Sequence, residues 1–149
     1  MNAFRFPLQR ALDLRQFQLK LEEAKFERAT ADLAAVDRER DALRAARTTA
    51  ENQVRSAAVV GRDLAALGTF RRRAHIEEER IAARRARCEA VREERRSAMF
   101  EARRKLRLLE RLKERRQAEW NAAAAKELEE IASESYSSQW VRGSNRQAR

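Results

Sequence analysis

The fold of this chain is decided by residues 70–131, which read FRRRAHIEEERIAARRARCEAVREERRSAMFEARRKLRLLERLKERRQAEWNAAAAKELEEI and contain neither glycine nor proline. Apolar residues recur here at coiled-coil spacing, in two rows whose members are seven residues apart. The rows contain Phe70, Ala74, Ile81, Cys88, Val91, Ala98, Ala102, Leu109 and Leu112. We expect one long helix whose apolar seam packs along another helix of similar length.

The composition agrees with this interpretation. The 149 residues are 43% hydrophobic and 39% charged, and they include only 3 glycines and 1 proline. A fold with strands would need turn residues about every ten positions. This is the composition of a long helix or coiled coil, so we expect no sheet and no deep core.

The first half of the chain carries the matching stripe. Pro7 fits a first helical turn, and from there an apolar row repeats every seven residues. Its members are Leu12, Leu19, Phe26, Leu33 and Val54, and the companion row contains Leu8, Ala29, Val36, Leu43, Ala50 and Ala57. Arg40 and Arg47 occupy the first row between Leu33 and Val54. The seam is therefore expected to be weaker near the middle of the chain.

Gly61 and Gly68 bracket the one place where the chain is expected to reverse. The sequence predicts a helix over about 7–58, a turn over about 59–69 and a helix over about 70–132. The fold class is then all-α, an antiparallel two-helix coiled-coil hairpin forming one elongated rod over 1–132. Residues 133–149 lose the apolar period and are expected to form a flexible basic tail.

Late in the second helix the apolar row moves to Met99, Leu106, Trp120, Ala124, Leu128 and Ile131. Such a shift predicts a stutter in the heptads. Trp120 is large enough to pack across the hairpin on the region of Leu8 and Leu12.

Two apolar sets leave alternatives open. Leu14, Phe17 and Leu21 lie off the seam, and they either widen the packed face or form a docking surface for another protein. Leu64, Leu67, Phe70 and Ile76 cluster at the expected turn, where they either cap the hairpin or contact a partner.

The net charge of +10 lies mainly in the second half. Residues 1–69 hold 12 basic and 10 acidic side chains, whereas residues 70–149 hold 22 and 14. Many arginines between Arg71 and Arg116 have acidic neighbours three or four positions away, which is typical of a solvated, ion-paired helix surface. An acidic protein surface or a nucleic acid are the alternative partners of this face.

The sequence contains no motif for catalysis. It has one histidine, His75, expected to be exposed, and one cysteine, Cys88, expected to be a small core residue. There is no phosphate loop and no metal-ligand spacing, so we expect no enzyme activity, cofactor, metal or small-molecule ligand. No apolar run is long enough for a signal peptide or a membrane span, and we expect a cytoplasmic protein.

Residues 4–15, FRFPLQRALDLR, the Glu/Arg-rich heptads without glycine and the run LERLKERR at 109–116 together resemble the FliJ family. These are small proteins of the bacterial flagellar type III export apparatus. The resemblance implies a stalk-like coiled coil, monomeric when free, at the cytoplasmic face of the inner membrane. The implied partners are the hexameric export ATPase, the export-gate membrane protein and export chaperones.

From geometry and this resemblance, two contact regions are expected. The ATPase-contacting end comprises Leu8, Leu12, Leu14, Arg15 and Trp120, and the gate-contacting tip comprises Leu64, Leu67 and Phe70. The competing hypotheses are a basic coiled coil that binds nucleic acid, a structural homodimer that pairs the seams of two chains, and a stalk of a virulence-type secretion system. The interleaved acidic residues weigh against nucleic acid, and the break between Gly61 and Gly68 weighs against the homodimer.

Overall fold

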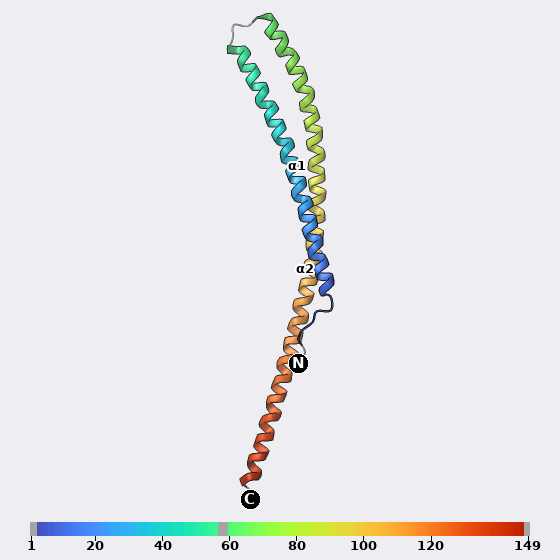
Figure 1. Cartoon of the computed structure of the whole chain (residues 1–149), viewed down its shortest axis with the longest axis vertical. Coiled ribbons are helices and arrows are strands. Elements are labelled where there is room, and N and C mark those ends of the chain that lie inside the picture. Colours follow the sequence, from blue (N-terminus) through green and yellow to red (C-terminus); the bar gives the residue numbers. More distant parts are fainter. Residues whose placement is uncertain (1–2, 57–59, 148–149) are drawn as a thin grey trace. The chain divides into compact units, whose positions relative to one another are not determined.

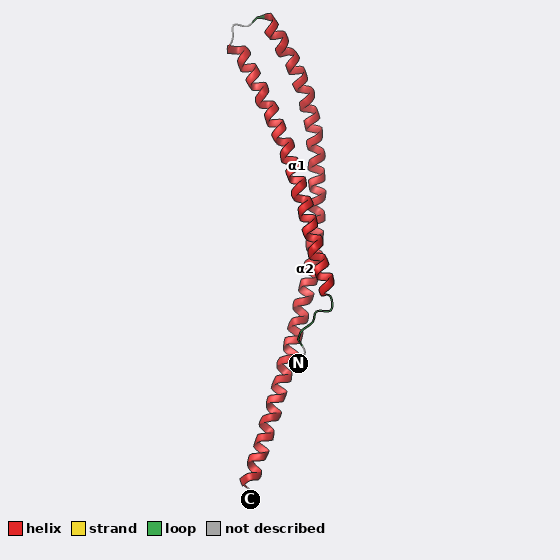
Figure 2. Ribbon diagram, viewed as in Figure 1, coloured by secondary structure: helices red, strands yellow, loops and turns green. Residues whose placement is uncertain are grey.

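The computed structural model describes residues 3–56 and 60–147, with side chains described through Ser138 and at Trp140. Two helices contain nearly all of these residues, α1 (Gln9–Ser56) and α2 (Gly61–Gln147) (Figures 1 and 2). The helices pack against each other in opposite directions, and the described residues contain no strand. The chain is therefore an all-α helical hairpin, which confirms the predicted fold class.

Both helix starts have a local cause. Pro7 stands in the turn before α1, where Gln9 N–H donates to the Phe6 carbonyl at 3.1 Å. At the start of α2, the Val60 backbone N–H donates to Oδ2 of Asp63 at 3.4 Å, and Asp63 N–H returns a bond to the Val60 carbonyl at 2.9 Å. This reciprocal arrangement is half of a capping box and holds the first turn.

The predicted turn over 59–69 is wrong at its second boundary, because α2 already begins at Gly61. Gly61 and Gly68 both have negative φ angles, and a Cβ added at either would meet nothing within 4 Å. Gly68 is thus an ordinary helical residue and not a turn residue. Residues 57–59, which include the end of the first expected helix and the first residue of the expected turn, lie outside the described residues.

The predicted end of the second helix near residue 132 is also wrong. α2 continues to Gln147, where a flexible tail was expected. In this part Ser133 and Ser135 donate hydroxyl hydrogen bonds to carbonyls three residues earlier, and Ser137 and Ser138 to carbonyls four residues earlier. The serine hydroxyls find their hydrogen-bond acceptors on the backbone of the same helix. The helix therefore does not need the apolar period to continue.

The described chain divides into two compact units, Phe17–Arg103 and Met1–Gln16 with Arg104–Arg149. In the first unit, the predicted seam of α1 is confirmed: Ala29, Leu33 and Val36 are buried. Arg40 and Arg47 are half-buried at the seam positions that the heptad assigns them. Their long stems cover the groove while their charged ends reach water.

On α2 one of the two predicted rows is wrong. Ala74 and Ile81 are buried, as expected, but Val91 is exposed. The second row instead runs through the buried or half-buried residues Glu78, Arg85, Arg92, Met99, Leu106 and Lys113. With the row of Ala74 it keeps an unbroken spacing of four and three residues, so the stutter expected near Met99 does not occur.

In the second unit, Phe6, Leu12 and Leu106 are buried. Lys113 Nζ donates to Oε1 of Gln9 at 3.0 Å, which joins α2 to the first turn of α1. After Lys113, every described side chain of α2 except Ala124 is exposed. The buried seam of this unit therefore ends near Lys113, although the helix itself continues to Gln147.

Candidate interaction surfaces

The residues before α1 fold onto α2 and form the first candidate surface. The rings of Phe4 and Trp120 lie 6.1 Å apart between centroids, tilted by 55°. A cavity of about 600 Å³ opens beside this pair; it is lined by Ala3, Phe4, Arg5, Pro7, Arg116, Glu119 and Trp120. Trp120 therefore packs on Phe4, in the segment that precedes the expected leucines.

The expected ATPase-contacting residues lie in this same unit but differ in access. Leu8 and Leu14 are exposed, Trp120 is at the border of exposure, and Arg15 is half-buried. Leu12 is only 4% exposed, so it holds the helices together and does not offer a contact surface. Phe4, which forms the aromatic pair with Trp120, is not among these expected residues.

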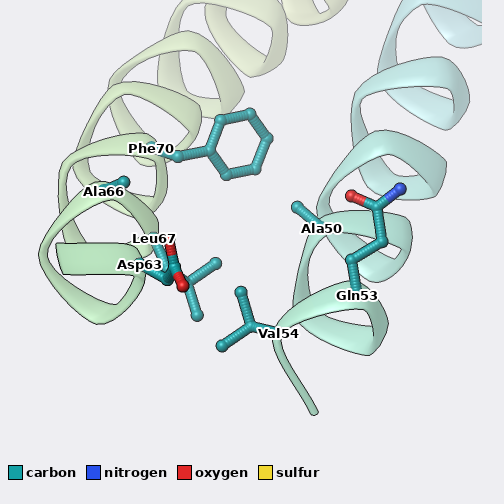
Figure 3. Close-up of a pocket in the computed structure, with 7 residues that line it drawn as sticks. All are labelled: Ala50, Gln53, Val54, Asp63, Ala66, Leu67 and Phe70. Atoms are coloured by element: carbon teal, nitrogen blue, oxygen red, sulfur yellow. The ribbon is translucent and has the colours of Figure 1, made fainter. Parts of the chain in front are cut away.

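The second candidate surface is a cavity of about 370 Å³ between the C-terminal end of α1 and the start of α2. Figure 3 shows Leu67 and Phe70 of α2 directed toward Val54 and Ala50 of α1, with Asp63 and Gln53 beside them. Leu67 and Phe70 are half-buried, and Val54 and Ala50 are the last described residues of the two α1 seam rows. The apolar seam is thus open at this end.

Leu64, the third residue of the predicted tip, does not line this cavity and is exposed, as is Ile76. The structure therefore brings Leu67 and Phe70 together and leaves Leu64 outside. The sequence alone did not indicate that Ala50 and Val54 share this site. The signal was present, because both residues stand on the predicted α1 rows next to the turn.

Ion pairs cross between the helices where the seam is polar. Arg85 Nε donates to Oδ1 of Asp37 at 2.8 Å, and this hydrogen bond lowers the pKa of Asp37 and raises that of Arg85. Partial burial acts to raise the pKa of Glu51, but the hydrogen bonds and charges of Arg71 and Arg47 outweigh it, so the pKa is lowered. Both carboxylates are held ionised by arginines.

These pairs follow a pattern in which α1 supplies the acid and α2 the base. Arg71 pairs with Glu51 at 3.0 Å, Arg103 with Glu23 at 3.1 Å, and Arg84 with Glu39, each with the acid on α1. One pair reverses the pattern, that of Glu78 on α2 with Arg47 on α1 at 3.3 Å. Other arginines pair along α2 itself, such as Arg80 with Glu77 and Arg96 with Glu93. This is the ion-paired surface that the sequence predicts.

Exposed apolar side chains remain outside both cavities. Phe17 is 65% exposed, and Leu14 and Leu21 are also exposed, so the interpretation that they widen the packed face is wrong. Phe100 is exposed between Arg96 and Arg103, whose guanidinium carbons lie 5.6 and 6.0 Å from the ring centroid. The sequence analysis missed Phe100, which a cation–π spacing of three and four residues could have indicated.

The part of the chain that the structure describes contains no candidate metal site. No three His, Cys, Asp or Glu side chains there lie close enough to hold a metal ion. His75 is exposed, as expected, and Cys88 is half-buried in the seam. None of the described helices has an apolar stretch that could cross a membrane.

The fold places the chain in the class of all-α helical hairpins, here with ion pairs across the seam. Comparison with known proteins does not narrow the class: no protein-family model, no curated protein and no solved structure matches the chain.

Proposed function

We propose that this chain is a non-enzymatic coiled-coil component of a bacterial flagellar type III export apparatus. It binds the hexameric export ATPase, promotes ring assembly and activity, and links the ring to the export gate and export chaperones. It acts in the cytoplasm, at the membrane face of the flagellar basal body. The proposal rests on the resemblance of residues 4–15 to the FliJ family and on the class of fold.

The single observation that carries the proposal is the packing of this same segment on α2. Phe4 contacts Trp120, and Gln9 accepts a hydrogen bond from Lys113, so the residues of the resemblance sit in one folded unit with α2. A helical pair of this kind can enter the opening of a ring, and its net positive charge favours acidic groups there. Leu8 and Leu14 are the exposed apolar residues that this end offers the ATPase.

The open seam beside Phe70 supports a second contact, with the export gate. An apolar cavity of about 370 Å³ is large enough to accept one or two side chains of a partner helix. Asp63 at its edge favours a basic residue on that partner. A stalk of a virulence-type secretion system would use the same two surfaces, and the identity of the ATPase that responds distinguishes the two systems.

The test is the ATP hydrolysis rate of a flagellar export ATPase as nuclease-treated protein is titrated in at physiological salt. We expect a saturable rise that is complete near one chain per hexamer. Leu14→Gln should weaken this activation, whereas Leu64→Gln should leave it intact, because the two leucines are similarly exposed, at 54% and 55%, but lie at different surfaces.

An unchanged rate together with the absence of co-elution would contradict the ATPase contact. If Leu64→Gln or Phe70→Ala abolished binding while Leu14→Gln bound normally, the two contact surfaces would have to be exchanged. Binding to duplex DNA that weakens steeply as salt rises would favour the nucleic-acid hypothesis instead, since such binding is driven by counterion release.

A further inference from the structure

The last part of α2 is a helix whose apolar residues have no partner within the described chain. Leu128, Ile131, Tyr136 and Trp140 are all more than half exposed, and Trp140 reaches 70%. Exposed large apolar residues are ordinary when scattered singly, but a continuous line of them marks an interaction surface. The arrangement on this helix is such a line.

The residues form one ridge with a spacing of four. It runs through Ala124, Leu128, Ala132, Tyr136 and Trp140, with Ile131 beside Leu128. Rows spaced by four residues are the ridges that pack into the grooves of another helix, the commonest mode of helix packing. The ridge alternates aromatic, small and aliphatic side chains, which suits interdigitation with a helical partner.

The charge of this segment is opposite to that of the rest of the chain. Residues 117–141 hold five acidic side chains and one basic side chain, in a protein of net charge +10. At about 100° per residue, Glu127 lies on one edge of the ridge beside Leu128 and Glu129 on the other, while Lys126 and Glu134, each two residues from a ridge position, lie on the far face. The apolar ridge is therefore bordered by carboxylates on both sides.

The carboxylates beside the ridge favour some binding partners over others. An anionic bilayer attracts helices with Lys and Arg on the polar face, so it would repel this segment. A second copy of the same segment would bring like charges together at Glu127 and Glu129, which is unfavourable. A basic helical surface satisfies both the apolar ridge and the carboxylates.

We propose that residues 124–140 are a docking helix for a partner protein that presents an apolar groove bordered by lysine or arginine side chains. The docking lies beyond the proposed contacts with the export ATPase and gate, and it holds whether or not those contacts exist. The ridge shares no residue with those contacts, because the export proposal rests on Leu8, Leu14, the pair of Phe4 with Trp120 and the turn cavity.

The test uses Trp140 as a reporter and a peptide as the probe. Trp120→Phe leaves Trp140 as the only tryptophan, and this variant is titrated in 0.15 M salt with an amphipathic helical peptide built of leucine and lysine. We expect a saturable blue shift of the emission. A leucine and glutamate peptide of the same pattern should produce none, because the carboxylates repel it.

Matched variants locate the site. Leu128→Gln with Ile131→Gln should weaken binding of the basic peptide at least about tenfold. Leu108→Gln should leave it unchanged, because Leu108 is an equally exposed leucine, at 60%, in the basic part of α2. Glu127→Lys with Glu129→Lys should reverse the preference toward the acidic peptide.

Three results would overturn the proposal. The first is an equal response to the two peptides, or none to either. The second is a blue shift and a doubled mass that appear on raising the protein concentration alone, which would make a second copy the occupant. The third is a blue shift with phosphatidylglycerol vesicles in place of the basic peptide.

Discussion

Arg85 of α2 and Asp37 of α1 meet across the seam of the hairpin, 48 residues apart in sequence, through a hydrogen bond of 2.8 Å. Arg92 occupies the same row one heptad later, and its Nε atom is buried without a hydrogen-bond partner. The two arginines occupy equivalent positions but have opposite effects on the stability of the fold. One completes a charge-assisted hydrogen bond, and the other leaves a donor unsatisfied.

The first prediction compares methionine at these two positions. Arg92→Met should raise the free energy of unfolding by about 1 kcal/mol, because it removes a buried unsatisfied donor and methionine is a good helix former. Arg85→Met should lower the stability, because Asp37 loses its partner. Urea unfolding followed by circular dichroism measures both, and a loss of stability in both variants would contradict the assignment of Arg92.

The second prediction concerns acid. The pKa values of Asp37 and Glu51 are lowered in the folded chain, so folding is favoured by their ionised forms. That stability is fully present above the ordinary values of 3.8 and 4.5 and is lost as the pH falls through the lowered folded values. The melting temperature should therefore drop below about pH 4.5. Asp37→Asn with Glu51→Gln should be less stable at pH 7 and should show a smaller drop.

The third prediction concerns the glycine inside α2. Gly68→Ala should stabilise the chain by about 0.5–1 kcal/mol, because alanine restricts the unfolded chain and is the better helix former. Nothing within 4 Å obstructs the added methyl group. Gly61→Ala, at the first helical residue, is the control and should change the stability less. If Gly68 instead belonged to the turn, alanine would destabilise the chain.

The fourth prediction separates the seam from the surface with one type of residue. Ile81 is 3% exposed and Ile76 is 51% exposed, both on α2 and five residues apart. Ile81→Ala should cost about 2 kcal/mol, near the low end for a buried isoleucine because a two-helix seam encloses little space. Ile76→Ala should stay within about 0.5 kcal/mol. Equal costs would mean that the seam runs elsewhere on α2.

How much the sequence predicts is visible at the two rows of α2. The row of Ala74 and Ile81 could be found because it is apolar throughout its first half. The second row could not, because Arg85 and Arg92 occupy it and a search for apolar residues chose the neighbouring row of Val91. A seam between only two helices is shallow, so long charged side chains can cross it and pair at its edge.

Apolar spacing alone is also insufficient to predict the ends of α2 and the candidate surfaces. The start at Gly61 depends on the bond between Val60 and Asp63, a local contact that overrides the usual role of glycine at turns. Leu67 and Phe70 could be placed near the turn from spacing, but their cavity depends on the opposing face of α1. The helix beyond residue 132 could not be predicted from the heptads, because its apolar residues follow a spacing of four and not the seven-residue repeat.

The last prediction concerns the contact between Phe4 and Trp120, which holds the segment before α1 on α2. In a Trp140→Phe background, Trp120 is the only tryptophan and reports this contact. Phe4→Ala should shift its emission to the red, since the ring loses its cover, and should cost about 1 kcal/mol for the aromatic pair. Tyr136→Ala, an exposed aromatic residue elsewhere on α2, should leave the emission unchanged. An unshifted spectrum in Phe4→Ala would mean that the segment is held by other contacts, and Leu8 and Leu14 would then keep their positions without it.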